Sequence, residues 1–261
     1  MRLGCCVGPE LIDTAADIGY DFVELSVDVL APEQPEEAFL QVKETLASAR
    51  VKPEVWDISL PPGVKVCGPS VDWPRVARYV NTALRRAAAA GGSVVAFACG
   101  DCSRVPLGFD RRDALAQATD FLRVCGAVAR RHSLIVGVEP VGAKRSNLVN
   151  SVPQAMELAR RVDMPEVGVL PSCLQMTQES HSLLDVVDAA AWLAHVHISA
   201  ADLEAEGPGA ASARELLAAL HMADYDGRIA VQADWKRPDE EMKRALESLR
   251  RCCEETLRGT T

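Results

Sequence analysis

Two short stretches, LIVGVEP at residues 134–140 and LAHVHIS at residues 193–199, decide the fold and locate the chemistry. Both are runs of apolar and β-branched residues, the pattern of a strand that is buried within a parallel sheet. Glu139 lies near the end of the first run, and His197 lies near the end of the second. The two stretches therefore predict buried strands whose carboxyl ends present a carboxylate and an imidazole.

Similar runs recur at regular intervals, separated by segments in which apolar residues have helical spacing. Because parallel strands need crossover connections, this alternation indicates the α/β class and a parallel sheet. Eight such units predict a single (β/α)8 barrel over residues 1–261. An open doubly wound sheet is the main alternative, but no G-x-G-x-x-G sequence follows the first run. The predicted strands are residues 2–7, 21–27, 51–60, 93–99, 134–139, 167–170, 193–199 and 227–233, and the helical segments are 35–49, 74–91, 110–132, 152–162, 211–222 and 239–257, with shorter ones at 9–19 and 178–190.

Composition and charge exclude several classes of protein. The net charge of −9 and the lack of a Lys/Arg cluster argue against a nucleic-acid partner. No apolar run is long enough to cross a membrane, and the first ten residues do not resemble a signal peptide. We therefore expect a cytoplasmic protein with a small-molecule substrate. A homo-oligomer is compatible with this expectation.

The nine cysteines are scattered along the chain, which suits a reducing compartment better than a disulfide framework. Cys99 and Cys102 form a C-x-x-C, but no second pair at metal-binding spacing accompanies them. We interpret the cysteines as small apolar filler.

In a barrel of this kind, functional residues gather at the carboxyl ends of the strands. His195 and His197 are two apart on one strand, so their side chains share a face. His197 is expected at the mouth, and His195 one layer deeper. Any one of the strand-end residues could simply cap the barrel, but several converging on one rim favour a site. They are Glu24, Trp56 with Asp57, the loop 100–104, Glu139, Ser172 with Gln175, His197, and Gln232 with Asp234.

Six segments, in order along the chain, resemble the xylose-isomerase-like TIM barrels, a family of sugar and sugar-phosphate isomerases and epimerases related to endonuclease IV. The resemblance implies a barrel whose mouth holds a divalent cation, commonly manganese, magnesium, cobalt or zinc. It also implies that two glutamates move a proton on and off the carbon beside a carbonyl. The segments are GYDFVELSV (19–27), GDCSRVPLGFD (100–110), VGVEPVGAKRSNLVNSV (136–152), VGVLPSCLQM (167–176), HVHIS (195–199) and DYDGRIAVQADW (224–235).

By the same resemblance, the family's first glutamate falls on Glu139 and its histidine on His197. The aspartate position falls on Ser172, the second histidine of D-x-x-H on Gln175, and the closing glutamate on Gln232. Two of four implied metal ligands thus remain, Glu139 and His197.

The two replacements remove two negative charges that would face the ion, and hard cations prefer charged oxygen ligands. Gln232 can offer a carbonyl oxygen, but an amide cannot act as a general base near neutral pH. We expect either no metal or a weakly bound one, with Glu139 as the surviving base and His197 as a group that polarises the substrate.

Other residues match family positions near the substrate. Arg104 could hold a carboxylate, phosphate or hydroxyl group, or could form a loop salt bridge, and Asn147 follows the fifth strand. Trp56 and Trp235 could stack on a ligand ring, and packing is an equal alternative for both. The expected substrate-binding residues are Arg104, Asn147, Trp56, Asp57, Gln175, Gln232 and Trp235.

Three functions remain open. The first is an isomerase or epimerase acting on a small polyhydroxylated carbonyl compound with weakened or lost metal binding. The second is a metal-independent acid–base enzyme, such as a dehydratase, cyclase or other isomerase. The third is a non-catalytic ligand-binding protein on an inherited scaffold.

Overall fold

Eight parallel strands form the centre of the protein. The structure is a computed structural model that describes residues 1–98, 100–178, 182–204 and 208–259. The hydrogen-bonded strand order is β6-β5-β4-β3-β2-β1-β8-β7, and each strand runs parallel to its neighbours. The strands are β1 (Arg2–Cys6), β2 (Phe22–Ser26), β3 (Pro53–Asp57), β4 (Val94–Ala98), β5 (Ile135–Glu139), β6 (Val167–Val169), β7 (Val196–Ser199) and β8 (Arg228–Gln232).

The two edge strands of this order, β6 and β7, meet through isolated parallel bridges. Val169 pairs with Leu193, and Ser172 pairs with His197. The His197 N–H donates to the carbonyl oxygen of Pro171 at 3.0 Å. These contacts complete a (β/α)8 TIM barrel, as the alternating sequence pattern predicts.

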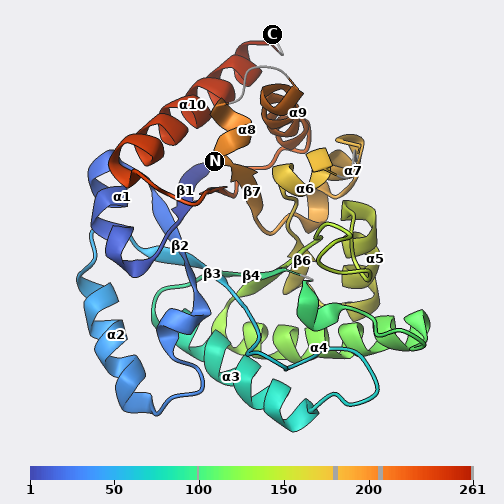
Figure 1. Ribbon diagram of the computed structural model, residues 1–261. Coiled ribbons are helices and arrows are strands. Elements are labelled where there is room, and N and C mark those ends of the chain that lie inside the picture. The colour runs from blue at the N-terminus through green and yellow to red at the C-terminus, as the bar shows by residue number, and fades with distance from the viewer. Residues whose placement is uncertain (99, 179–181, 205–207, 260–261) are drawn as a thin grey trace.

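Helices surround the strands on all sides of the view in Figure 1, with α2, α3 and α4 along one half of the ring and α5, α9 and α10 along the other. Their starts follow local sequence rules: Asp72 caps α3 by accepting from the Arg75 N–H at 3.0 Å, and Asp110 caps α4 by accepting from the Arg112 N–H at 2.7 Å. The helices are α1 (Ile12–Ile18), α2 (Glu36–Ser48), α3 (Trp73–Ala89), α4 (Arg111–His132), α5 (Val152–Val162), α6 (Cys173–Gln178), α7 (Leu184–Asp188), α8 (Ala200–Glu204), α9 (Pro208–Met222) and α10 (Pro238–Gly259), with short 3-10 helices η1 (Pro9–Leu11), η2 (Val27–Leu30), η3 (Asp101–Ser103) and η4 (Ala190–Trp192).

Alternate residues of each strand face the barrel interior, and the others face the helices. A small apolar cluster fills the interior, separate from the larger core beneath the helices. Gly4 is required there, because a β-carbon at this position would stand 2.5 Å from the Phe22 ring. The interior cluster consists of Phe22, Val55, Val94, Ala96, Leu170 and Ala230, with Cys6 packed against it.

The predicted strand and helix positions agree with the structure, with different ends. Of the run 51–60 only β3 is a regular strand, and of the run 193–199 only β7 is one. The helical segment expected at 178–190 contains α7, whereas α6 begins earlier, at Cys173, and ends at Gln178, the first residue of that segment. Residues 99 and 179–181 from these predictions lie outside the described residues. Within the described part of the chain, no helix is long and apolar enough to cross a membrane.

Candidate functional site

Glu24 lies at the centre of a buried polar network inside the barrel mouth. It is an inward-facing residue of β2, two positions after Phe22, and only 2% of its surface is exposed. His197 Nε2 lies 3.1 and 3.0 Å from the two carboxylate oxygens of Glu24. His195 Nε2 lies 3.0 Å from one of the same oxygens. His195, immediately before β7, and His197, within β7, therefore both contact the carboxylate of Glu24.

The other ring nitrogen of His197 faces the fifth and eighth strands. His197 Nδ1 lies 3.3 Å from Glu139 Oε1 and 2.9 Å from the side-chain nitrogen of Gln232. The structure thus brings together Glu139, His197 and Gln232, three residues that the sequence analysis places at one rim. Because both ring nitrogens face carboxylate oxygens, a doubly protonated imidazolium fits this position, with the Gln232 amide turned so that its oxygen accepts from Nδ1.

The charges of this network are strongly coupled. Burial alone would lower the pKa of His197, but the carboxylates of Glu24 and Glu139 outweigh it and hold that pKa well above its ordinary value. Burial alone would raise the pKa of Glu24, but His197 and His195 outweigh it and hold the pKa of that carboxyl below its usual range. Burial lowers the pKa of His195, against the opposing effect of Glu24. The network is therefore an ion pair of Glu24 and His197 with a neutral His195.

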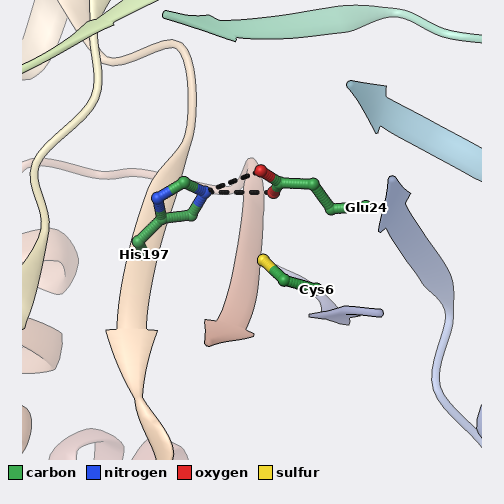
Figure 2. Close-up of side chains that lie close together, drawn as sticks. All are labelled: Cys6, Glu24 and His197. Carbon is green, nitrogen blue, oxygen red and sulfur yellow. Dashed lines mark hydrogen bonds and ion pairs between the residues drawn. The ribbon is translucent and has the colours of Figure 1, made fainter. Parts of the chain in front are cut away.

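Cys6 of β1 completes a group with metal-ligand chemistry. Figure 2 shows Glu24 and His197 reaching toward one another from β2 and β7, with the Cys6 sulfur beside them. One ligand atom from each of these three residues lies within 4.8 Å of the others. Burial and the nearby charge of Glu24 raise the pKa of the Cys6 thiol well above its ordinary value. These three residues and the family positions Glu139, Ser172 and Gln232 are the candidates for holding a cation.

A cavity of about 410 Å³ opens above this network. Its polar lining includes Asp57 from β3, Glu139 from β5, Gln232 from β8, and Gln175 from α6. Arg145, from the loop after β5, also lines it, and the missing side chain of Gly100 leaves room for the guanidinium, since a β-carbon there would stand 3.0 Å from Arg145 Nη2. The cavity has the size and the polar groups of a small-molecule site.

The carboxyl group of Asp57 has a pKa far above its ordinary value. It follows Val55 on the inward face of β3, and its nearest side-chain partner is the Ser59 hydroxyl at 3.4 Å. Burial, then the charges of Glu24 and Glu139, raise the pKa of Asp57 to about 7. This carboxyl can therefore give up or take a proton near neutral pH.

Two residues expected to bind substrate instead connect loops. The Arg104 guanidinium donates to the carbonyl oxygen of Lys144. The Asn147 amide accepts from the Val105 N–H at 2.8 Å and donates to the Val105 carbonyl oxygen at 3.2 Å. Neither residue lines the cavity. They tie the loop after β4 to the loop after β5, which carries Arg145.

The two tryptophans also lie away from the cavity. Trp56 is fully buried and packs among the core beneath the helices, where it touches Gly92. Since neighbours on a strand face opposite ways, the inward direction of Asp57 turns Trp56 outward. Trp235 lines a separate pocket and donates from Nε1 to the Cys6 carbonyl oxygen at 2.8 Å. Stacking of either ring on a ligand in the cavity does not fit these positions.

Gln175 lines the cavity but is held in place, because its side-chain oxygen accepts from the Gly142 N–H at 2.6 Å. Sequence reasoning placed Glu24 at the rim but missed Arg145. The central place of Glu24 in the network follows from its contacts with both histidines. Arg145 lies within a family-like segment, but no sequence pattern directs its side chain to the cavity.

Comparison with known proteins places this barrel in a family. The model of the xylose isomerase-like TIM barrel family matches residues 12–252, so the chain belongs to that family. None of the curated proteins compared with the chain matches it.

Solved structures with the same fold include two sugar epimerases. D-psicose 3-epimerase from Clostridium cellulolyticum H10, with D-tagatose, has a TM-score of 0.82 at 15% identity, covering 97% of this chain and 99% of that one. The 3-keto-D-glucoside 4-epimerase YcjR from E. coli has a TM-score of 0.79 at 19% identity, covering 97% and 100%. The IOLI protein with a bound zinc atom has a TM-score of 0.74 at 15% identity, covering 98% and 99%.

Proposed function

We propose that this chain is an enzyme of the sugar isomerase and epimerase type that moves a proton at the carbon beside the carbonyl of a small polyhydroxylated compound. Glu139 is the base, and no tightly bound metal takes part. The observation that carries this proposal is the position of Glu139, which lines the cavity while its Oε1 contacts His197 Nδ1 at 3.3 Å. Family membership and the epimerases of the same fold support the reaction class.

His197 acts in this proposal as a positioning residue. The sequence suggests that His197 polarises the substrate, but only 1% of the residue is exposed, and its ring nitrogens face Glu24 on one side and Glu139 on the other. The ring therefore holds the Glu139 carboxylate in one orientation. Arg145 at the cavity wall supplies positive charge for the oxygen that becomes negative when the proton leaves.

The donor chemistry does not fit a tightly held divalent cation. At the family positions, Ser172 and Gln232 offer neutral oxygens where the ion would need charge. In the alternative group, the only anionic oxygen ligand is Glu24, beside a thiol and an imidazole, which hard cations do not favour. The proposed proton transfer therefore uses the chain's own residues.

The test is incubation of the purified protein in D2O with D-fructose, D-tagatose, D-psicose and a 3-keto-glucoside, followed by proton NMR. We expect conversion of at least one compound, with deuterium entering beside its carbonyl. General bases typically contribute about 10²- to 10⁴-fold, so Glu139→Gln should slow conversion by at least about 100-fold. Glu33→Gln, which removes an exposed carboxylate paired with Arg75, should leave conversion unchanged. Equal rates in Glu139→Gln and the natural chain would refute the proposal.

A further inference from the structure

Two carboxylates enter the cavity from different strands, and the proposed reaction so far uses one. Glu139 ends β5 and Asp57 ends β3, and both line the cavity. In the strand order, β4 lies between them. Neighbouring strands are about 4.8 Å apart, so β3 and β5 are about 9–10 Å apart across the sheet.

The strand between the two carboxylates leaves space open. The inward-facing side chains of β4 near the mouth are those of Ala96 and Ala98. Asp57 is in register with Ala96, and Glu139 is in register with Ala98. The β4 side chains beside the two carboxylates are therefore methyl groups. Glu139 is therefore offset from Asp57 by two residues, about 6–7 Å, along the strands, and the two α-carbons are about 11–12 Å apart. A carbon approached by a carboxylate oxygen at about 3–3.5 Å on each face needs about 6–7 Å between the two oxygens. Both side chains enter the cavity, and their lengths account for the rest of the distance.

We propose that Asp57 is the second acid–base group of the reaction, so that this chain inverts a stereocentre beside a carbonyl by removing a proton from one face and adding one to the other. The inference rests on the proposed function and narrows it to epimerisation. Asp57 would then act in place of the family's closing glutamate. Gln232 stands at that glutamate's position and cannot act as an acid or base, because an amide has no useful proton affinity.

The proton and electron balance closes within the cavity. The Glu139 carboxylate takes the proton from the carbon, and the C–H electron pair moves into the C–C bond to form an enediolate, with the carbonyl oxygen gaining the negative charge beside Arg145. The protonated Asp57 then delivers its proton to the opposite face, and the oxygen's electron pair returns to re-form the carbonyl. Glu139 ends protonated and Asp57 ionised, and exchange with water restores the starting state.

The surroundings of Asp57 suit the acid role. Its carboxyl is partly buried, it lies near the negative charges of Glu24 and Glu139, and its pKa is raised to about 7. Near neutral pH the proton is therefore available on Asp57, while the Glu139 carboxyl group contacts the ring of His197. Two carboxyl groups in one cavity with different environments are assigned opposite roles on that basis.

The test uses Asp57→Asn and Glu139→Gln in D2O, with the ketose from the panel above that the natural chain converts fastest and, separately, with its epimer. Asp57→Asn should lose inversion by at least about 100-fold yet still exchange the proton of the epimer that Glu139 deprotonates. Glu139→Gln should show the reciprocal result, with exchange only in the other epimer. Asp120→Asn removes an exposed carboxylate of α4 that pairs with Arg123, and it should behave as the natural chain.

Each outcome separates the inference from the proposed function. Inversion at the natural rate in Asp57→Asn would overturn the role of Asp57 and leave the function of Glu139 standing. Loss of both exchange and inversion in a cooperatively folded Asp57→Asn would likewise overturn the division of roles. Absence of exchange and inversion in the natural chain would overturn the proposed function, and this inference with it.

Discussion

His197 contacts both carboxylate oxygens of Glu24, at 3.1 and 3.0 Å, across the interior of the barrel from β7 to β2. The two residues are almost fully buried, so solvent water cannot take the place of either partner if the other is removed. Glu24 also holds His195, which means that one carboxylate organises the polar core below the cavity.

Glu24→Gln should therefore destabilise the fold strongly. Removing one partner of a buried ion pair typically costs about 3–5 kcal/mol because the other charge is left uncompensated. The measurement is the free energy of unfolding in urea. Glu33→Gln is the matched control, since Glu33 pairs with Arg75 at the surface, where such pairs contribute about 0–1 kcal/mol. Equal costs for the two variants would contradict the assigned ion pair.

The raised pKa of Asp57 predicts a pH-dependent stability. The pKa rises from the ordinary value of 3.8 to about 7 in the fold, so the folded state binds this proton more tightly than the unfolded chain. The stabilisation is complete below the unfolded pKa and is lost as pH rises through about 7. Against Asp57→Asn, the natural chain should lose up to about 4 kcal/mol of relative stability between about pH 4 and about pH 8. A pH-independent difference between the two unfolding free energies would contradict this.

The pH profile of activity follows from the same group. The acid–base pair works while it holds one proton, so kcat/KM should fall as pH rises above about 7, when Asp57 loses it. The exchange reaction that remains in Asp57→Asn should lack this alkaline limb. A limb that persists in that variant would assign the titration to another group facing Asp57; these are Glu24, Glu139, His197, Cys6 and Tyr79.

Filling the space between the carboxylates should block the substrate. Ala98→Leu extends a side chain into the cavity that Ala98 lines, between the positions of Asp57 and Glu139. We expect kcat/KM to fall by at least about tenfold, equivalent to about 1.4 kcal/mol, with folding retained. Ala47→Leu, at an exposed position of α2, is the control for adding the same atoms. Unchanged kcat/KM in Ala98→Leu would place the substrate elsewhere.

Much of the fold was predictable because strand and helix periodicity are local properties. The rule that strand ends share one rim also placed Glu139, His197 and Gln232 together, as the structure does. Trp56 and Asp57 were both expected to bind substrate. Neighbouring residues of a strand face opposite ways, so only one of the two can reach the cavity, and this could have been read from the sequence.

Other features could not be read from the sequence. Arg104 and Asn147 are occupied by backbone groups about 40 positions away, and only the packing of two loops decides such partners. The separation of Asp57 from Glu139 depends on strand order and register, and the raised pKa of Asp57 depends on charges from other strands. These are properties of the assembled barrel.

The most direct test of the central claim, proton transfer by carboxylates without a tightly held metal, is metal analysis of protein purified without chelator. The Ser172→Asp, Gln232→Glu double variant, which restores both missing charges, is measured beside it. We expect the natural chain to hold far less than one divalent ion and to keep its activity in EDTA, while the double variant gains tightly bound metal. A natural chain that carries one tightly bound ion per molecule and loses its activity in EDTA would contradict the account.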